Sequence, residues 1–447
     1  MSRTQDMTKG SPVKQMTLFA LPLIAGNIGQ QLYMVADSVI VGRGVGSEAL
    51  AAVGATDWTY WLILWVVQAL TQGFAARVSQ HIGARDEEKV RKSIAMSVVL
   101  CVVLSILLTA VSLLIAAPML RILGTPENIF ASSEVYLKIL FAGTGIVMAY
   151  NMAAAVLRAF GDGRTPLIGI VIAACTNIVL DLLFVFGFRW GVAGAAIATV
   201  AAQLLAFLYC LVSFAKMSYV KLERTDWSFS STTVRTLLSL GFPMALQNIF
   251  IAVGGMILQS AINRHGFLYV AGFTATNKLY GLLESSSLAF GFAVTTYMAQ
   301  NYGAGLYDRI RKGMKSIAVI GLAMSVTVCV LMLIFGRPLL GMFISSADEN
   351  AAEVLDIAYH YLRIMSIFLP TLYLLNGYRS MLQGLGRGIA VMISGIVEFV
   401  MRVSVALVFS RIWEGTIFYA EPGAWTATAV YLILACIVVF RRLTGAR

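Results

Sequence analysis

The sequence predicts an all-α integral membrane protein with twelve transmembrane helices in two six-helix bundles, related by a pseudo-two-fold axis along the membrane normal. Composition and an internal repeat both indicate this fold. Of the 447 residues, 59% are hydrophobic and only 12% are charged, whereas soluble domains carry roughly 25% charged residues. Too few charged residues are present to cover the surface of a soluble globule. The composition therefore predicts an integral membrane protein.

The internal repeat extends over the whole chain, and its offset changes by only a few residues. Near the start of each half, Leu21-Pro22-x4-Asn27 corresponds to Phe242-Pro243-x4-Asn248. The other matched pairs are Gly83-Ala84 with Gly303-Ala304, Tyr136-Leu137-Lys138-Ile139 with Tyr361-Leu362-Arg363-Ile364, Asn151 with Asn376, and Leu157-x3-Gly161-x-Gly163 with Leu382-x3-Gly386-x-Gly388. Duplication of this kind in a polytopic membrane protein is typical of transporters.

Twelve apolar segments are long enough to cross a hydrocarbon core, which needs about 20 helical residues. In chain order they cover about 16–41, 49–81, 91–116, 129–157, 165–187 and 191–215, and then about 237–262, 268–301, 314–335, 351–382, 388–410 and 423–440. Between the halves, 216–236 is polar and charged. This pattern predicts an N-terminal lobe over 1–215, a cytoplasmic linker over 216–236 and a C-terminal lobe over 237–447.

Basic residues predict the orientation, because Lys and Arg concentrate in the cytoplasmic loops of membrane proteins. One set of loops is rich in them: Arg3, Lys9, Lys14, Arg85, Lys89, Arg91, Lys92, Arg158, Arg164, Lys216, Lys221, Arg224, Arg235, Arg309, Arg311, Lys312, Lys315, Arg379, Arg387, Arg441, Arg442 and Arg447. The alternate loops carry about one each. Both termini are therefore expected in the cytoplasm, and the membrane is expected to be a bacterial or archaeal plasma membrane.

The same placement explains the formal charge of +11 without a nucleic acid partner, since the basic residues form no continuous face. The five cysteines all lie in apolar segments without metal-ligand spacing, so no metal or other cofactor is expected. The polar start, Met1 to Lys14, does not resemble a cleaved signal peptide.

Two carboxylates lie inside the predicted spans, where a charge costs on the order of 3 kcal/mol. Asp37 lies roughly 6 Å and Asp181 roughly 9 Å from the outer ends of their outward-running spans at the helical rise. Both should therefore reach a similar depth in the N-terminal lobe. Desolvation and the neighbouring charge would favour the protonated form of such a pair, which would titrate together.

Polar neighbours at helical spacing predict a cavity around these carboxylates. Its expected lining residues are Gln30, Tyr33, Tyr136, Asn151, Asn177 and Thr199. The sequence leaves open an alternative for the polar neighbours, namely hydrogen bonds that only join helices.

The chain resembles the multidrug and toxic compound extrusion (MATE) family over both lobes. The resemblance rests on Pro22, Asp37 and Gly42-Arg43, Gly83-Ala84, Leu157-Arg158-Ala159-Phe160-Gly161-Asp162, Asn177-x3-Asp181, Gly194-Ala195-Ala196-Ile197-Ala198-Thr199, and Ala299-Gln300-Asn301-Tyr302-Gly303-Ala304. The acidic N-lobe resembles the DNA-damage-inducible (DinF-like) branch. The norfloxacin-export branch has a glutamate where this chain has Ile251 and Ala252, and this difference argues against a cation site in the second lobe.

The resemblance implies an antiporter, not an enzyme, that exports organic and often cationic, amphiphilic compounds as a proton or Na⁺ enters. Asp37 would be the primary proton acceptor and Asp181 its coupled partner, with Pro22 as a bend in the first span. If Na⁺ is the coupling ion, Asp37, Asp181, Asn177 and Thr199 supply suitable hard oxygen ligands. The expected partners are small organic molecules and the lipid bilayer, and the protein is expected to be a monomer.

Other ionisable residues lie in the second lobe. Glu398 and Arg402 are spaced i, i+4, which favours an intrahelical ion pair. Lys278 and Glu284 could line a central cleft, whereas apolar packing is the simpler explanation of the Met and aromatic positions nearby.

Competing functions are disfavoured by missing motifs. The chain has no Gly-Lys pair for an ATP-binding loop and no hydrolase signature. A lipid-linked-precursor flippase of the same superfamily remains the main rival, although it would be expected to need a cationic cavity.

Overall fold

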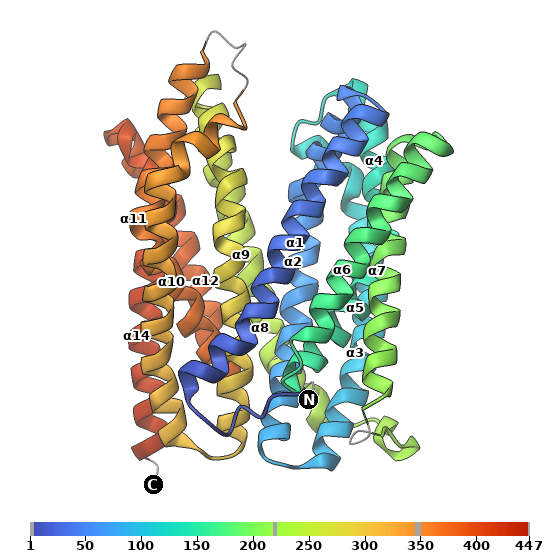
Figure 1. Cartoon of the computed structure of the whole chain (residues 1–447), viewed down its shortest axis with the longest axis vertical. Coiled ribbons are helices and arrows are strands. Elements are labelled where there is room, and N and C mark those ends of the chain that lie inside the picture. The colour runs from blue at the N-terminus through green and yellow to red at the C-terminus, as the bar shows by residue number, and fades with distance from the viewer. Residues whose placement is uncertain (1–3, 218–220, 345–349, 446–447) are drawn as a thin grey trace. The chain divides into compact units, whose positions relative to one another are not determined.

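The structure consists of helices joined by short loops (Figure 1). The computed structural model describes residues 4–217, 221–344 and 350–445, and it has no strand within those ranges. In the first half the α-helices are α1 (Pro12–Gly44), α2 (Ser47–Gly83), α3 (Glu87–Ile122), α4 (Glu127–Ala142), α5 (Thr144–Ala159), α6 (Arg164–Asp181) and α7 (Gly191–Ala215). The predicted all-α fold is confirmed.

The second half repeats this succession with α8 (Ser231–Asn263), α9 (Phe267–Gly303), α10 (Tyr307–Gly341), α11 (Ala351–Gly384), α12 (Gly388–Ser404), α13 (Ser410–Ile412) and α14 (Ala420–Gly445). The matched helices have nearly equal lengths. Helices α1 and α8 each have 33 residues, and α2 and α9 each have 37. Within the described residues, eight helices are long and apolar enough to span a membrane, or nine with the bent pair described below.

The sequence predicts a single helix over 129–157, but the structure has two helices there. Helices α4 and α5 form a broken span bent by 47°. Gly143 lies at the break. A Cβ atom there would lie 2.6 Å from Val200 Cγ2 of α7, so only glycine permits this close approach. The matching helix in the second half, α11, is continuous over 34 residues.

Two spans end in π-helical segments at matching places in the repeat. Segment η1 (Leu182–Gly187) continues α6, and η3 (Val405–Phe409) continues α12. Such wide turns are rare and are frequent at functional sites. Here each follows a buried charged residue, Asp181 before η1 and Arg402 shortly before η3.

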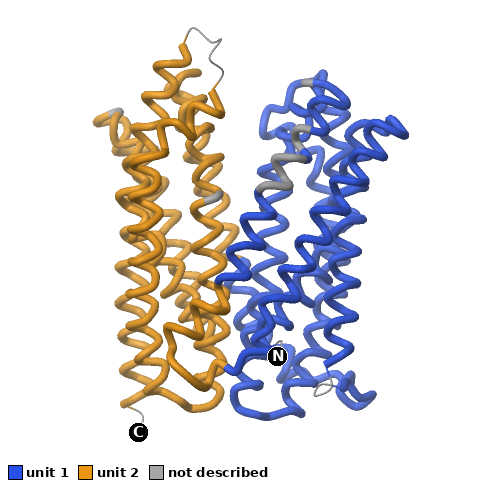
Figure 2. Tube along the Cα trace, in the orientation of Figure 1, with its two compact units in different colours: residues 1–6, 21–245 blue, residues 7–20, 246–447 orange. Residues whose placement is uncertain are grey.

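The chain divides into two compact units (Figure 2): unit 1 is Met1–Asp6 with Leu21–Ala245, and unit 2 is Met7–Ala20 with Leu246–Arg447. These units differ from the predicted lobes 1–215 and 237–447, and the described part of the predicted linker 216–236 lies in unit 1. The difference arises because the first part of α1 belongs to unit 2 and the first part of α8 belongs to unit 1. Pro22 and Pro243 lie next to these two crossover points.

Packing inside each unit explains these assignments. In unit 1, a Cβ at Gly73 of α2 would lie 2.5 Å from the Gly241 Cα of α8, so two glycines allow the helices to touch. Also in unit 1, the 3₁₀ segment η2 (Arg224–Trp227) of the linker contacts α3. In unit 2, α11 packs against α9, α10 and α14.

Candidate functional site

The two acidic residues singled out in the sequence lie together in unit 1. Asp181 is the last residue of α6 and is fully buried, whereas Asp37 of α1 is partly buried. Their side chains are close enough to interact with each other electrostatically. The two carboxylates therefore form one acidic group in unit 1, while their similar depth in the membrane stays a prediction.

Three of the four carboxylate oxygens lack hydrogen-bond partners among the described residues. They are Asp37 Oδ1, Asp181 Oδ1 and Asp181 Oδ2, and all three are shielded from solvent. A buried polar atom without a partner costs about 1–3 kcal/mol, and more when it is charged. Two carboxylates cannot donate to one another, so a single added proton would supply the missing donor.

Asn177 and Thr199 extend this polar group. Asn177, one helical turn before Asp181 on α6, is only 1% exposed. Its Nδ2 donates to Thr199 Oγ1 of α7 at 3.4 Å, while Thr199 Oγ1 donates to its own helix at Ala195 O, 3.1 Å away. Asn177 Oδ1 has no hydrogen-bond partner among the described residues. A further oxygen is thus available close to the carboxylates.

Tyr136 completes the side of the site that α4 contributes. Its ring is 6% exposed and lies within electrostatic range of Asp37, Asp181 and Asp57. Asp57, on α2, was not singled out in the sequence analysis, and its side chain is exposed. The available signal was an acidic residue within the predicted span at 49–81, the same signal that identified Asp37.

The remaining predicted lining residues are less tightly linked to the carboxylates. Gln30 is partly buried on α1, and the side chain of Tyr33 lies outside the described residues. Asn151 Nδ2 donates to Val147 O of its own helix, α5, at 2.8 Å. Asn151 thus makes a hydrogen bond within its own helix. The role of Asn151 as a lining residue of the cavity stays a prediction.

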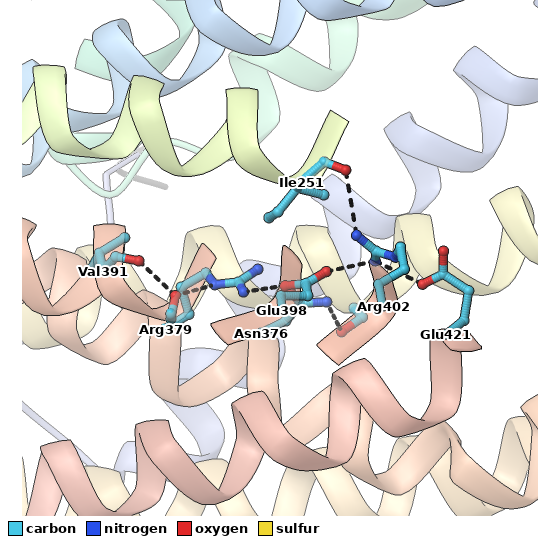
Figure 3. A network of polar contacts seen from close by, with 9 residues as sticks. Ile251, Asn376, Arg379, Val391, Glu398, Arg402 and Glu421 are labelled. Atoms are coloured by element: carbon cyan, nitrogen blue, oxygen red, sulfur yellow. Dashed lines mark hydrogen bonds and ion pairs between the residues drawn. The ribbon is translucent and has the colours of Figure 1, made fainter. Parts of the chain in front are cut away.

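Unit 2 contains a buried chain of ion pairs (Figure 3). Glu398 Oε2 accepts from Arg379 Nη2 at 2.6 Å, and Glu398 Oε1 accepts from Arg402 Nη2 at 2.9 Å. Arg402 Nη2 also pairs with Glu421 Oε2 at 2.7 Å, and its Nη1 donates to Ile251 O of α8 at 3.3 Å. The network joins α11, α12, α14 and α8, and the i, i+4 ion pair expected from the sequence is present.

Arg379 corrects the sequence analysis, which counted it among the cytoplasmic loop residues. It lies within α11, is 7% exposed and donates from Nε to Ser394 Oγ at 3.1 Å. Its partner Glu398 lies on another helix, so sequence spacing gave no signal of the pair.

The other two candidates of the second lobe, Glu284 and Lys278, lie in different environments. Glu284 of α9 is partly buried, and its carboxyl group interacts with Tyr280, Glu398, Arg402 and Glu421. It therefore lies within electrostatic range of Glu398, Arg402 and Glu421 of the network, on a further helix. Lys278 is exposed on the same helix, and its proposed place in a cleft stays a prediction.

Comparison with known proteins identifies relatives over nearly the whole chain. The family model described as MatE matches residues 22–183 and again residues 243–408, which reproduces the internal repeat. A Bacillus subtilis (strain 168) protein named "Probable multidrug resistance protein YpnP" is 31% identical over 420 residues, with 92% of each chain covered. "Probable multidrug resistance protein NorM" of Thermotoga maritima is 25% identical, covering 92% of this chain and 88% of the relative.

Solved structures show the same fold. One described as "Outward-facing conformation of a multidrug resistance MATE family transporter of the MOP superfamily" superposes with a TM-score of 0.91 at 25% identity, covering 100% of this chain and 99% of that chain. A second, described as "Crystal structure of MATE in the straight conformation", gives a TM-score of 0.89 at 24% identity, covering 98% of each chain. The similarity confirms the predicted twelve-helix transporter architecture, while the DinF-like branch stays a prediction.

Proposed function

The chain belongs to the MatE family of multidrug and toxic compound extrusion transporters, and from this premise we propose that it exports organic compounds in exchange for protons. Asp37 and Asp181 are the proton-binding pair in this proposal. The observation that carries it is the set of buried carboxylate oxygens without hydrogen-bond partners among the described residues. A proton is the smallest ligand that satisfies two such groups at once.

Proton binding would change both the charge and the hydrogen bonding of the pair. Protonated at one oxygen, Asp37 becomes a donor to Asp181 and the pair loses one negative charge. An organic cation held by that charge would then bind more weakly, because the electrostatic attraction falls with the charge of the site. Loss of the proton on the opposite side would restore the binding charge. Binding of the proton and binding of the compound would therefore exclude each other at the site, and this exclusion couples proton entry to compound export.

Sodium coupling at the same residues is the second candidate. It is supported by the unpartnered Asn177 Oδ1, which adds a neutral oxygen to the two carboxylates and to the Thr199 hydroxyl. Sodium prefers hard oxygen ligands of this kind. The ion would travel as a co-substrate in place of the proton.

A flippase for lipid-linked precursors is less well supported. Binding an anionic pyrophosphate would require unpaired cationic side chains at the site. In unit 2, the two buried arginines of the network are each paired with glutamate. The unit 1 site is acidic.

The test uses purified protein in liposomes, a fluorescent organic cation, and an imposed pH gradient or an imposed Na⁺ gradient. Wild type is compared with Asp37→Asn and with the matched control Glu127→Gln, an exposed carboxylate at the start of α4. We expect the pH gradient to drive transport, at least a tenfold loss in Asp37→Asn, and no loss in Glu127→Gln. A normal thermal unfolding midpoint for Asp37→Asn would show that the loss is not caused by misfolding.

Each other outcome selects another mechanism. Transport driven only by the Na⁺ gradient and lost in Asp37→Asn would favour sodium coupling at the same site. Undiminished proton-driven transport by Asp37→Asn would contradict the proposed pair. An absence of transport under both gradients would favour the flippase.

A further inference from the structure

We propose that a site formed by Gln300, Asn301 and Arg309 binds the chain's own segment Met7–Gly10 as a releasable latch on the first part of α1. We call the part of α1 in unit 2, Pro12–Ala20, the arm, and the matching part of α8 in unit 1, Ser231–Ala245, the α8 arm. The binding of the segment stands on its own contacts. Its gating of transport rests on the proposed antiport function.

Met7 is held at both of its main-chain polar groups. Its N–H donates to Gln300 Oε1 at 3.0 Å, and its carbonyl oxygen accepts from Asn301 Nδ2 at 3.0 Å. The Met7 side chain is fully buried. The site therefore fixes both the position and the direction of the segment through main-chain atoms, and it also encloses one apolar side chain.

Arg309 of α10 donates to three main-chain carbonyl oxygens of the same segment. Its Nη2 donates to Met7 O at 3.0 Å and to Lys9 O at 3.2 Å, and its Nη1 donates to Gly10 O at 2.8 Å. The planar guanidinium presents several donors in fixed directions, which suits a cluster of carbonyl oxygens.

The rest of the site positions that guanidinium. Asn301 Oδ1 accepts from Arg309 Nε at 2.8 Å, and the Tyr297 ring centre lies 5.6 Å from the guanidinium carbon. Tyr297 Oη donates to Arg309 O at 3.1 Å. These bonds preorganise the arginine for the carbonyls of the N-terminal segment, as they would for a ligand.

The segment leads directly into the arm, and the arm ends beside a proline. Residues from Leu21 onward belong to unit 1, and Pro22 follows the crossover. Proline removes one main-chain hydrogen bond and disturbs the preceding turn of a helix. The arm can therefore change its direction at Pro22 while the remainder of α1 keeps its contacts.

A similar arrangement occurs independently in unit 1. Arg91 of α3 donates from Nε to Asp226 Oδ2 at 3.2 Å, and Asp226, in the segment that precedes α8, is 5% exposed. The first part of α8, Ser231–Ala245, belongs to unit 1 and contains Pro243. In each half, an arginine near the start of the third helix thus holds the segment that leads into the other half's first helix.

This recurrence argues for a device and against a chance contact. Loops of duplicated proteins diverge freely. Here the arginine binds three carbonyl oxygens in one unit and a carboxylate in the other, yet in both units it holds the segment that leads into a first helix. Alternating access requires elements that have two arrangements. The arms, each with a proline at one end and an arginine latch at the other, meet that requirement.

The first test locks the latch with a cysteine pair, Met7→Cys with Gln300→Cys, in a chain whose five native cysteines are replaced by alanine. We expect oxidation to form the cross-link, to stop transport at least tenfold, and to be reversed by reductant. The single-cysteine chains are the matched controls. Failure to form the cross-link would overturn the binding of the segment, and undiminished transport by the cross-linked protein would overturn its gating role.

The second test weakens the latch and does not depend on transport. Arg309→Ala is compared with Arg311→Ala, an exposed arginine on the same helix. Hydrogen exchange of the peptide over residues 7–20 should be about tenfold faster in Arg309→Ala, as expected when hydrogen bonds to a charged group are lost, and unchanged in Arg311→Ala. Unchanged exchange in a folded Arg309→Ala would contradict the latch. Exchange is measurable even if the cysteine-free protein transports nothing under either gradient, so failure of the antiport proposal is distinguishable from failure of the latch.

Discussion

At the scale of single residues, the buried carboxylates of the two units differ in whether their oxygens have hydrogen-bond partners. In unit 2, Glu398 has an arginine partner at each oxygen, and the ion pairs are nearly closed to solvent. In unit 1, Asp37 and Asp181 retain oxygens without hydrogen-bond partners among the described residues. A carboxylate with a partner at each oxygen stabilises one conformation, whereas a carboxylate whose oxygens lack hydrogen-bond donors is suited to bind and release a ligand.

The stability of unit 2 should therefore depend strongly on Glu398. Glu398→Gln would leave the buried Arg379 without its carboxylate partner, while Arg402 would keep Glu421, and breaking such a buried pair typically costs about 3–5 kcal/mol. We expect a clear fall in the unfolding midpoint of the purified protein. The matched control is Asp356→Asn, which breaks the exposed ion pair with Arg337 at 2.7 Å and should cost no more than about 1 kcal/mol. Equal midpoints for the two variants would contradict a structural role for the network.

Sequence patterns predicted the acidic site better than the basic partners. Asp37 and Asp181 stand out because carboxylates are rare in apolar spans, and Asn177 follows from its spacing to Asp181 on one helix. Arg379 was misassigned to a loop because its distance from Glu398 in the sequence, 19 residues, carries no helical periodicity. Asp57 was missed although it carries the same signal as Asp37, an acidic residue inside a predicted span.

At the scale of elements, hydrophobic length predicted where helices run but not where they bend. Each predicted span corresponds to a helix, a bent pair or a helix with a π-helical end within the described residues. The break at Gly143 depends on Val200 of another helix, which no local pattern reports. The exchange of the arms likewise depends on contacts made far along the chain, such as Gly73 with Gly241.

The bend makes a specific prediction about α4 and α5. Gly143→Ala would place its Cβ 2.6 Å from Val200 Cγ2, which is closer than any real contact of this kind. Overpacking of this sort typically costs about 1–3 kcal/mol. Val200→Ala in the same chain should recover most of that loss, since it removes the clashing methyl groups. Thermal unfolding of the two single variants and the double variant forms a cycle, and additive losses would show that Val200 does not cause the glycine requirement.

At the scale of the whole molecule, the repeat and the basic loops together make a prediction about topology. Twelve spans, an even number, place both chain ends on one side of the membrane. Because the loops rich in Lys and Arg are expected to face the cytoplasm, we expect that side to be the cytoplasm. A fluorescent protein fused after residue 447 should fold and fluoresce, while alkaline phosphatase fused there should stay inactive. The opposite result should hold in the loop at Arg264–Gly266, between α8 and α9, since α8 carries the chain across once. Active phosphatase at the C-terminus would reverse the topology, and with it the side from which the latch of Arg309 would open the path for substrate.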